Sequence, residues 1–95
     1  MTETEALLTL LRETFREALP HRKLPADDAP LFGDGGPLDS MDLVNFAADV
    51  EDAVNARFGA DVVVADARAL SRSRSPFRSL RALAEWCAEL LDAAA

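Results

Sequence analysis

The sequence predicts an all-α protein: a small bundle of three to four helices, with a long loop between the first and the second helix. Apolar residues recur at helical spacing in three separate stretches. A proline- and glycine-rich stretch separates the first two of them. A chain of 95 residues can bury one core but not two, so residues 1–95 are expected to form a single domain.

The first helix is expected over residues 4–19. Its apolar residues lie at helical spacing, and charged residues occupy the other side. Thr2 or Thr4 is available as the N-cap, and Pro20 ends the helix because proline disfavours helical geometry in the residue before it. The expected buried face consists of Leu7, Leu8, Leu11, Phe15, Ala18 and Leu19.

Residues 20–38 are expected to form the long loop. They contain four of the five prolines and three of the four glycines and show no periodicity. Loops of this length in a compact domain are usually functional or disordered. Four apolar residues are expected to hold this one against the core: Leu24, Leu31, Phe32 and Leu38.

The second helix is expected over residues 40–58. Asp39 or Ser40 is a suitable N-cap, and Gly59 is the residue type expected just past a helix C-terminus. Apolar residues separated by three or four positions predict the buried stripe, which is Leu43, Ala47, Val50, Val54 and Phe58.

The rest of the chain predicts shorter elements and one more long helix. Residues 62–64 are expected to be extended, and Asp66 could cap one or two helical turns over residues 67–70. Ser79 is expected to cap a last helix that runs to Leu91. The buried face of that helix is predicted to be Leu80, Leu83, Cys87 and Leu90, with Trp86 beside it.

Charge and composition exclude several classes of function. The net charge of −7 disfavours nucleic acid and anionic membrane as partners. One cysteine excludes an internal disulfide, and with one histidine it leaves too few ligands for a structural zinc ion, so no metal is expected. No signal peptide or membrane-length apolar run is present, and we therefore expect a soluble, cytoplasmic protein. We also expect it to be a monomer.

Charge is also distributed unevenly along the chain. Residues 39–66 carry a net charge of −6, whereas residues 67–84 hold five arginines and no acid. The second long helix is therefore the acidic one, and the basic stretch from Arg68 to Arg81 lies outside it. A basic surface on another protein is the expected partner of the acidic helix.

Catalytic patterns are weak, and we expect no enzymatic activity. His21 is the only histidine and no G-x-S-x-G elbow surrounds any serine, which disfavours a catalytic triad. The stretch at residues 33–36 lacks the lysine of a phosphate-binding loop and is more simply a turn. The paired acids Asp27-Asp28 and Glu51-Asp52 are typical of solvated surfaces.

The segment Gly-Pro-Leu-Asp-Ser-Met-Asp-Leu-Val at residues 36–44 places an Asp-Ser pair after a long loop and at the start of an acidic amphipathic helix. With the order and length of the surrounding elements, this resembles the acyl carrier protein family over most of the chain. The resemblance implies covalent attachment of 4′-phosphopantetheine to Ser40, beside Asp39. The start of a helix favours a negative group, which suits a phosphodiester there.

The resemblance also implies partners and a recognition face. The partners would be a phosphopantetheinyl transferase, an acyl-loading ligase or transferase, and condensing or tailoring enzymes of polyketide or fatty acid biosynthesis. By position, partner recognition carries over to residues along the acidic helix, in addition to Asp39: Met41, Asp42, Val44, Ala48 and Glu51.

Three departures from the family pattern leave the cargo open. Pro37 and Leu38 replace a glycine-containing lead-in, the Asp-Ser helix is about one turn longer, and residues 68–81 are basic instead of acidic. Because the chain begins with methionine and holds one module, we expect a standalone carrier acting in trans. An aminoacyl or peptidyl carrier, an unmodified helical adaptor, and a small hydrolase using Ser40 are the alternatives.

Overall fold

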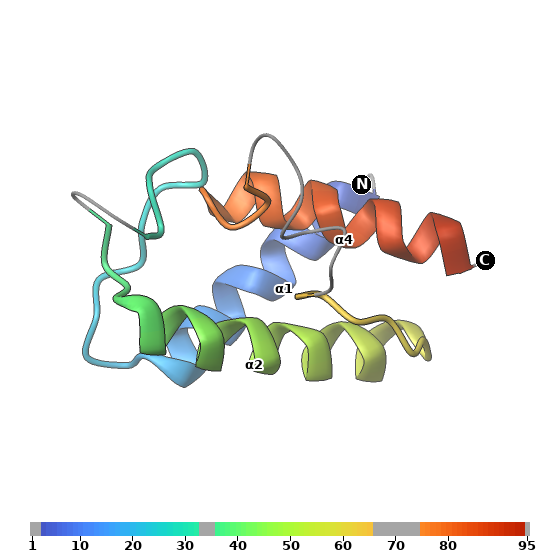
Figure 1. Cartoon of the computed structure of the whole chain (residues 1–95), viewed down its shortest axis with the longest axis horizontal. Helices are drawn as coiled ribbons and strands as arrows, with labels where there is room; N and C mark the ends of the chain where they lie inside the picture. The colour runs from blue at the N-terminus through green and yellow to red at the C-terminus, as the bar shows by residue number, and fades with distance from the viewer. Residues whose placement is uncertain (1–2, 33–35, 66–74, 95) are drawn as a thin grey trace.

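The computed structural model describes residues 3–32, 36–65 and 75–94. In this part of the chain three helices and no strand are present: α1 (Glu3–Ala18), α2 (Ser40–Phe58) and α4 (Leu80–Ala94) (Figure 1). The predicted small all-α bundle with a long loop between its first two helices is therefore confirmed. The short helix predicted at residues 67–70 lies outside the described residues.

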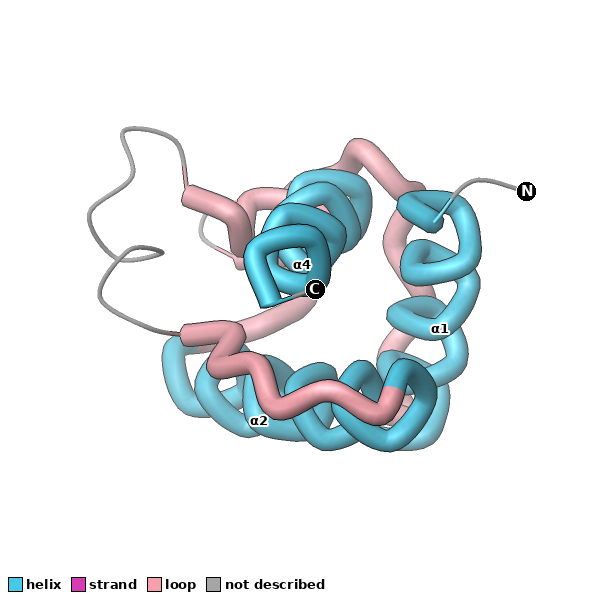
Figure 2. The backbone as a smooth tube through the Cα atoms, turned by 90° about the vertical axis from the view of Figure 1, so that its right-hand side faces the viewer, coloured by secondary structure: helices cyan, strands magenta, loops and turns pink. Residues whose placement is uncertain are grey.

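α1 is the helix that packs against both of the others. Viewed nearly along α4, the three helices surround one core (Figure 2). α1 begins one residue earlier than predicted, so Thr4 lies inside the helix and is not its cap. Its predicted apolar face is largely correct: Leu7, Leu8, Leu11 and Phe15 are buried, whereas Ala18 is exposed.

The boundaries of α2 follow from its two caps. Asp39 has extended backbone geometry and its side chain accepts a hydrogen bond from the backbone N–H of Asp42, as an N-cap does. Gly59 adopts the left-handed conformation (φ 61°, ψ 34°), and its N–H donates to the Asn55 carbonyl. Both ends of the helix are thus where the sequence predicts them.

The buried face of α2 differs from the predicted stripe at two phenylalanines. Ala47, Val50 and Val54 are buried as expected, and Leu43 is partly buried against the core. Phe58, however, is 39% exposed, and Phe46 is 1% exposed. The face is rotated toward α1, where the Phe46 ring packs edge-on against Phe15 with ring centroids 5.5 Å apart.

The long loop is held against the core by Leu31 and Leu38, which are buried, and by Leu24, which is partly buried. The prediction that Phe32 would join them is wrong, because its side chain is 44% exposed. The chain doubles back between these residues: the Leu38 N–H donates to the Leu31 carbonyl at 3.0 Å, and Phe32 and Leu38 form an isolated bridge.

Gly36 is required at this crossing. A Cβ atom at Gly36 would lie 2.7 Å from backbone atoms of Leu31 and Phe32, which is closer than side chains approach. The absence of a side chain therefore lets the loop close immediately before the start of α2.

Residues 62–64 are extended, as predicted, and they run along α2. Val62 and Val64 are buried and Val63 is exposed, which is the alternation of an extended chain. The Asn55 side chain makes two hydrogen bonds with the Val62 backbone, at 2.8 and 3.1 Å. Trp86 of α4 donates from Nε1 to the Val64 carbonyl at 2.8 Å, so this segment joins α2 to α4.

α4 begins as predicted and ends three residues later than Leu91. The Ser79 hydroxyl accepts the Ala82 N–H at 3.0 Å, which makes Ser79 its N-cap. The predicted core residues are all buried: Leu80, Leu83, Trp86, Cys87 and Leu90. No helix in the described part of the chain is both long and apolar enough to span a membrane.

Ion pairs attach the long loop to α1 and α4. Arg12 of α1 binds both carboxylate oxygens of Asp27, at 2.9 and 2.5 Å. Arg81 of α4 lies 3.8 Å from Asp27 and donates to Asp28 at 2.8 Å, while its backbone N–H donates to the Asp27 carbonyl. The hydrogen bond from Arg12 lowers the pKa of Asp27.

This lowered pKa predicts a dependence of stability on pH. The Arg12–Asp27 pair stabilises the fold above the unfolded-state pKa of about 4, and its contribution is lost as the pH falls through the lower pKa of the folded state. Asp27→Asn is therefore expected to lower the melting temperature at pH 7, with the difference from the original protein shrinking below about pH 4. Thermal unfolding followed by circular dichroism over this pH range tests the prediction. Asp52→Asn, at an exposed site, is the matched control, and an equal effect of both variants at pH 7 would contradict it.

Candidate functional site

Ser40 lies where the sequence places it, exposed and at the first residue of α2. The helix gives the residue a fixed backbone, whereas its side chain lies outside the hydrogen-bonded body of the helix. The first backbone N–H groups of a helix and its dipole favour a negative group at this position. The helix dipole therefore favours an anionic substituent on Ser40, while the Asp39 carboxylate already accepts one of the first N–H groups.

Asp39 and Asp42 form a capping box around Ser40. The Asp42 N–H donates to Asp39 Oδ1 at 2.8 Å, and the Asp39 N–H approaches Asp42 Oδ2 at 3.4 Å. Asp39 and Asp42, both predicted to take part in recognition, are thus also part of the helix cap. Their first effect is to fix the backbone on either side of Ser40.

Arg22, in the long loop, was not predicted from the sequence but belongs to this site. Its Nη1 lies 3.2 Å from Asp42 Oδ2, and the same nitrogen donates to the Pro37 carbonyl. Arg22 therefore connects the middle of the loop to the chain just before α2. No spacing in the sequence indicates this pairing, because the residues are 15 and 20 positions apart.

An open hollow of about 420 Å³ lies beside Ser40. Its walls come from the loop, including Arg22 and Phe32, and from the capped start of α2. Arg22 is the one cationic side chain among the described residues that line it, and it offsets part of the charge of Asp39 and Asp42. The lining residues that the structure describes include no histidine, so they offer Ser40 no imidazole base.

The phosphodiester of a phosphopantetheine group fits this arrangement. Ser40 is accessible, the helix start favours negative charge, and Arg22 supplies a guanidinium beside the same hollow. The hollow is open to solvent, which leaves room for a long substituent.

Three of the predicted recognition residues form an exposed surface on α2. Met41 is 74% exposed and Val44 is 68% exposed, and Ala48 is also exposed. Isolated exposed apolar side chains are common, but two this large within one turn of Ser40 are suited to contact with another protein. Asp42 is partly buried because of its cap and its pairing with Arg22.

Glu51 is placed differently from a free surface acid. It is partly buried, and its Oε1 accepts the Val64 N–H at 2.8 Å, so it holds the extended segment against α2. Asp52, which the recognition assignment omitted, is exposed and lies on the same helical stripe as Met41 and Ala48. Helical spacing from Met41 places Asp52 on this face, so the sequence already held the signal that Asp52 belongs with the recognition residues.

The Glu51–Val64 hydrogen bond predicts a stability effect. Glu51→Ala leaves the partly buried Val64 N–H without its acceptor, which is expected to cost about 1–3 kcal/mol. Glu51→Gln retains a side-chain oxygen that can accept and should lose less. Urea unfolding of both variants, with Asp52→Ala as the exposed control, measures the difference. A Glu51→Ala protein as stable as Asp52→Ala would show that the hydrogen bond contributes nothing.

Comparisons of the chain with protein-family models, with curated proteins and with solved structures found no match.

Proposed function

We propose that this chain is a carrier protein that holds an acyl or aminoacyl group on a phosphopantetheine arm attached to Ser40. The observation that carries the proposal is the position of Ser40: exposed, first in a capped helix, and beside an open hollow with a cation in its wall. The arm would supply a thiol, which holds the cargo as a thioester. The proposed setting is the cytoplasm, with the chain acting as a monomer.

Attachment requires only that Ser40 act as a nucleophile on coenzyme A. The Ser40 oxygen attacks the phosphorus atom on the pantetheine side of the diphosphate, and the phosphoanhydride bond breaks. Adenosine 3′,5′-bisphosphate leaves, and the Ser40 proton passes to a base of the transferase. The product is a phosphodiester on Ser40. Because the transferase supplies the base, the lack of an imidazole among the described residues beside Ser40 is compatible with this role.

The proposed docking face for the transferase and for the loading and condensing enzymes consists of Met41, Val44 and Ala48, with Asp42 and Asp52 at its edge. An apolar centre with a polar rim is typical of protein interfaces, in which methionine is enriched. An adaptor that is never modified would use the same face. The two functions differ in whether Ser40 is needed.

Intact-mass measurement tests the proposal. The purified chain is incubated with coenzyme A and a broad-specificity phosphopantetheinyl transferase, and the product is digested for peptide mapping. The expected result is a mass increase of one phosphopantetheine group per chain, located on Ser40. A mass that does not change, or a modified peptide from residues 71–79, contradicts the proposed attachment site.

Charge on the docking face should affect the rate of this reaction. Asp52→Lys is expected to slow the transferase at low salt, with the difference decreasing at raised salt, because exposed interface charges act mainly on association. Its effect on folding should stay within about 0.5 kcal/mol, since the side chain is exposed. Asp92→Lys makes the same charge change on α4 and is the control. Equal rates for the two variants at low salt would show that charge on α2 does not contribute to recognition by the transferase.

A further inference from the structure

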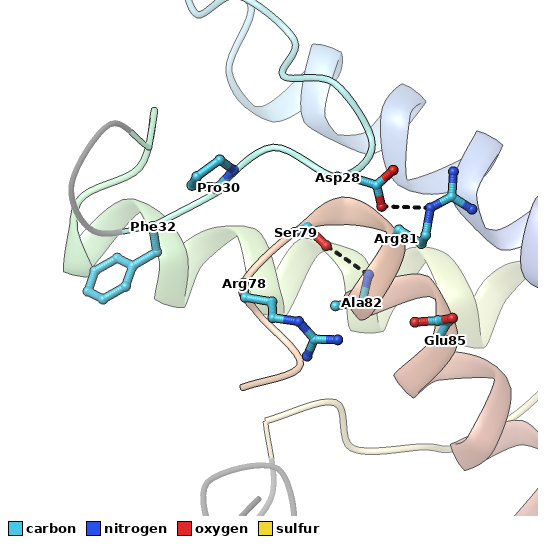
Figure 3. Close-up of a pocket in the computed structure, with 8 residues that line it drawn as sticks. All are labelled: Asp28, Pro30, Phe32, Arg78, Ser79, Arg81, Ala82 and Glu85. Carbon is cyan, nitrogen blue, oxygen red and sulfur yellow. Dashed lines mark hydrogen bonds and ion pairs between the residues drawn. The ribbon is translucent and has the colours of Figure 1, made fainter. Parts of the chain in front are cut away.

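A second hollow, of about 490 Å³, lies between residues 28–32 of the loop and the start of α4. Phe32 lies at one end of it and Glu85 at the other, with the Arg78 guanidinium between them (Figure 3). Pro30 and Ala82 contribute apolar surface to its wall. The hollow thus combines apolar surface with polar side chains along its length.

Phe32 connects this hollow with the one beside Ser40, because the residue lines both. The Phe32–Leu38 bridge holds it close to the chain segment that enters α2. Phe32 is 44% exposed, whereas its neighbours Leu31 and Leu38 in the same loop are buried. A substituent that extends from Ser40 across this exposed ring would reach the second hollow.

The charges of the second hollow favour a neutral ligand over an anion. Among the described residues that line it, Arg78 and Arg81 are balanced by Asp28 and Glu85, and Arg81 is paired with Asp28. An anion would therefore find no excess of positive charge among these described side chains.

We propose that the pantetheine part of the arm, once attached to Ser40, lies across Phe32 and occupies the hollow between the loop and α4. This inference depends on the proposed attachment at Ser40. Pantetheine is a neutral chain with two amides and a dimethyl group, which matches a hollow that is neutral and partly apolar. The arm is thereby held on the surface between visits to partner enzymes.

Named side chains can bind such a chain. One nitrogen of Arg78, Nη1, donates to the Ser75 carbonyl at 2.8 Å, and the guanidinium has further N–H groups for amide carbonyls of the arm. The Glu85 carboxylate offers acceptors for its amide N–H groups. Phe32 and Pro30 cover the dimethyl group, and burying part of an exposed phenyl ring is favourable.

A spin label on the arm tests this placement. The chain carrying the arm is treated with a thiol-reactive nitroxide, and paramagnetic broadening of backbone amides is measured by NMR. Cys87 does not compete for the label, because it is buried and burial raises the pKa of its thiol to about 12. The Ser40→Ala protein, treated in the same way, controls for labelling of Cys87.

The expected result is broadening at Phe32, Arg81, Ala82 and Glu85, and its loss in Phe32→Ala. Phe58→Ala removes another partly exposed phenylalanine, at the far end of α2, and should leave the broadening unchanged. Broadening confined to residues 39–44 would overturn the arm placement and leave the carrier function standing. A chain whose mass shows no arm on Ser40 would overturn both.

Discussion

Replacing Ser40 with alanine is expected to abolish phosphopantetheine attachment completely, with no increase in mass after incubation with coenzyme A and transferase. The reason is chemical, since alanine has no oxygen to form the phosphodiester. Folding should change by no more than about 0.5 kcal/mol, because the Ser40 side chain is exposed at the first residue of α2. The two measurements together separate loss of the attachment site from loss of structure.

Ser75→Ala is the matched control for this experiment. Ser75 is also exposed, but it precedes Pro76 outside the helices. Its replacement should leave attachment at the original level. An Ser40→Ala protein that still gains the mass of one phosphopantetheine group would show that another residue is modified. In a pathway assay, full activity of Ser40→Ala would instead favour the unmodified adaptor.

Phe46→Ala is expected to have the largest effect on stability. Removing a buried phenyl ring usually costs about 3–5 kcal/mol, through lost burial and the cavity that remains. Phe46 is 1% exposed and packs edge-on against Phe15, with an interplanar angle of 77°. For a domain whose total stability is typically about 5–15 kcal/mol, this loss would be a large part of the whole. Urea unfolding followed by circular dichroism measures it.

Phe58→Ala gives the comparison within the same helix. Its side chain is 39% exposed, so the truncation should cost roughly 1 kcal/mol, much less than at Phe46. The apolar spacing in the sequence, which places Phe58 on the buried stripe and Phe46 outside it, predicts the opposite order of stability loss. If Phe58→Ala were the more damaging of the two, the buried face of α2 described above would be wrong.

The sequence predicts the ends of α2 better than its buried face. Caps are local: Asp39 accepts a bond from Asp42, three residues away, and Gly59 adopts a conformation that other residues rarely do. The choice between Phe46 and Phe58 is not local. The two phenylalanines lie on opposite sides of the helical stripe that runs through Val50. Phe46 is the one that is buried, because α1 and its Phe15 pack against that side.

The residues of the candidate site also differ in how well the sequence predicts their placement. Exposure of Ser40 at the helix start follows from the adjacent cap and was predictable. The contact of Arg22 with Asp42 depends on how a loop of many residues folds back, and the sequence carries no signal of it. The role of Glu51 likewise depends on the segment at residues 62–64, whose Val64 N–H it accepts, so composition alone made it look like a free surface acid.

Trp86 gives this fold a built-in optical probe. It is the only tryptophan, and the chain has no tyrosine, so excitation at long ultraviolet wavelengths selects a single indole. That indole is 5% exposed and donates to the Val64 carbonyl. Its emission therefore responds to the release of the extended segment from α4 as well as to global unfolding. If an emission change precedes the loss of helical signal during denaturation, the segment detaches before the helices unfold.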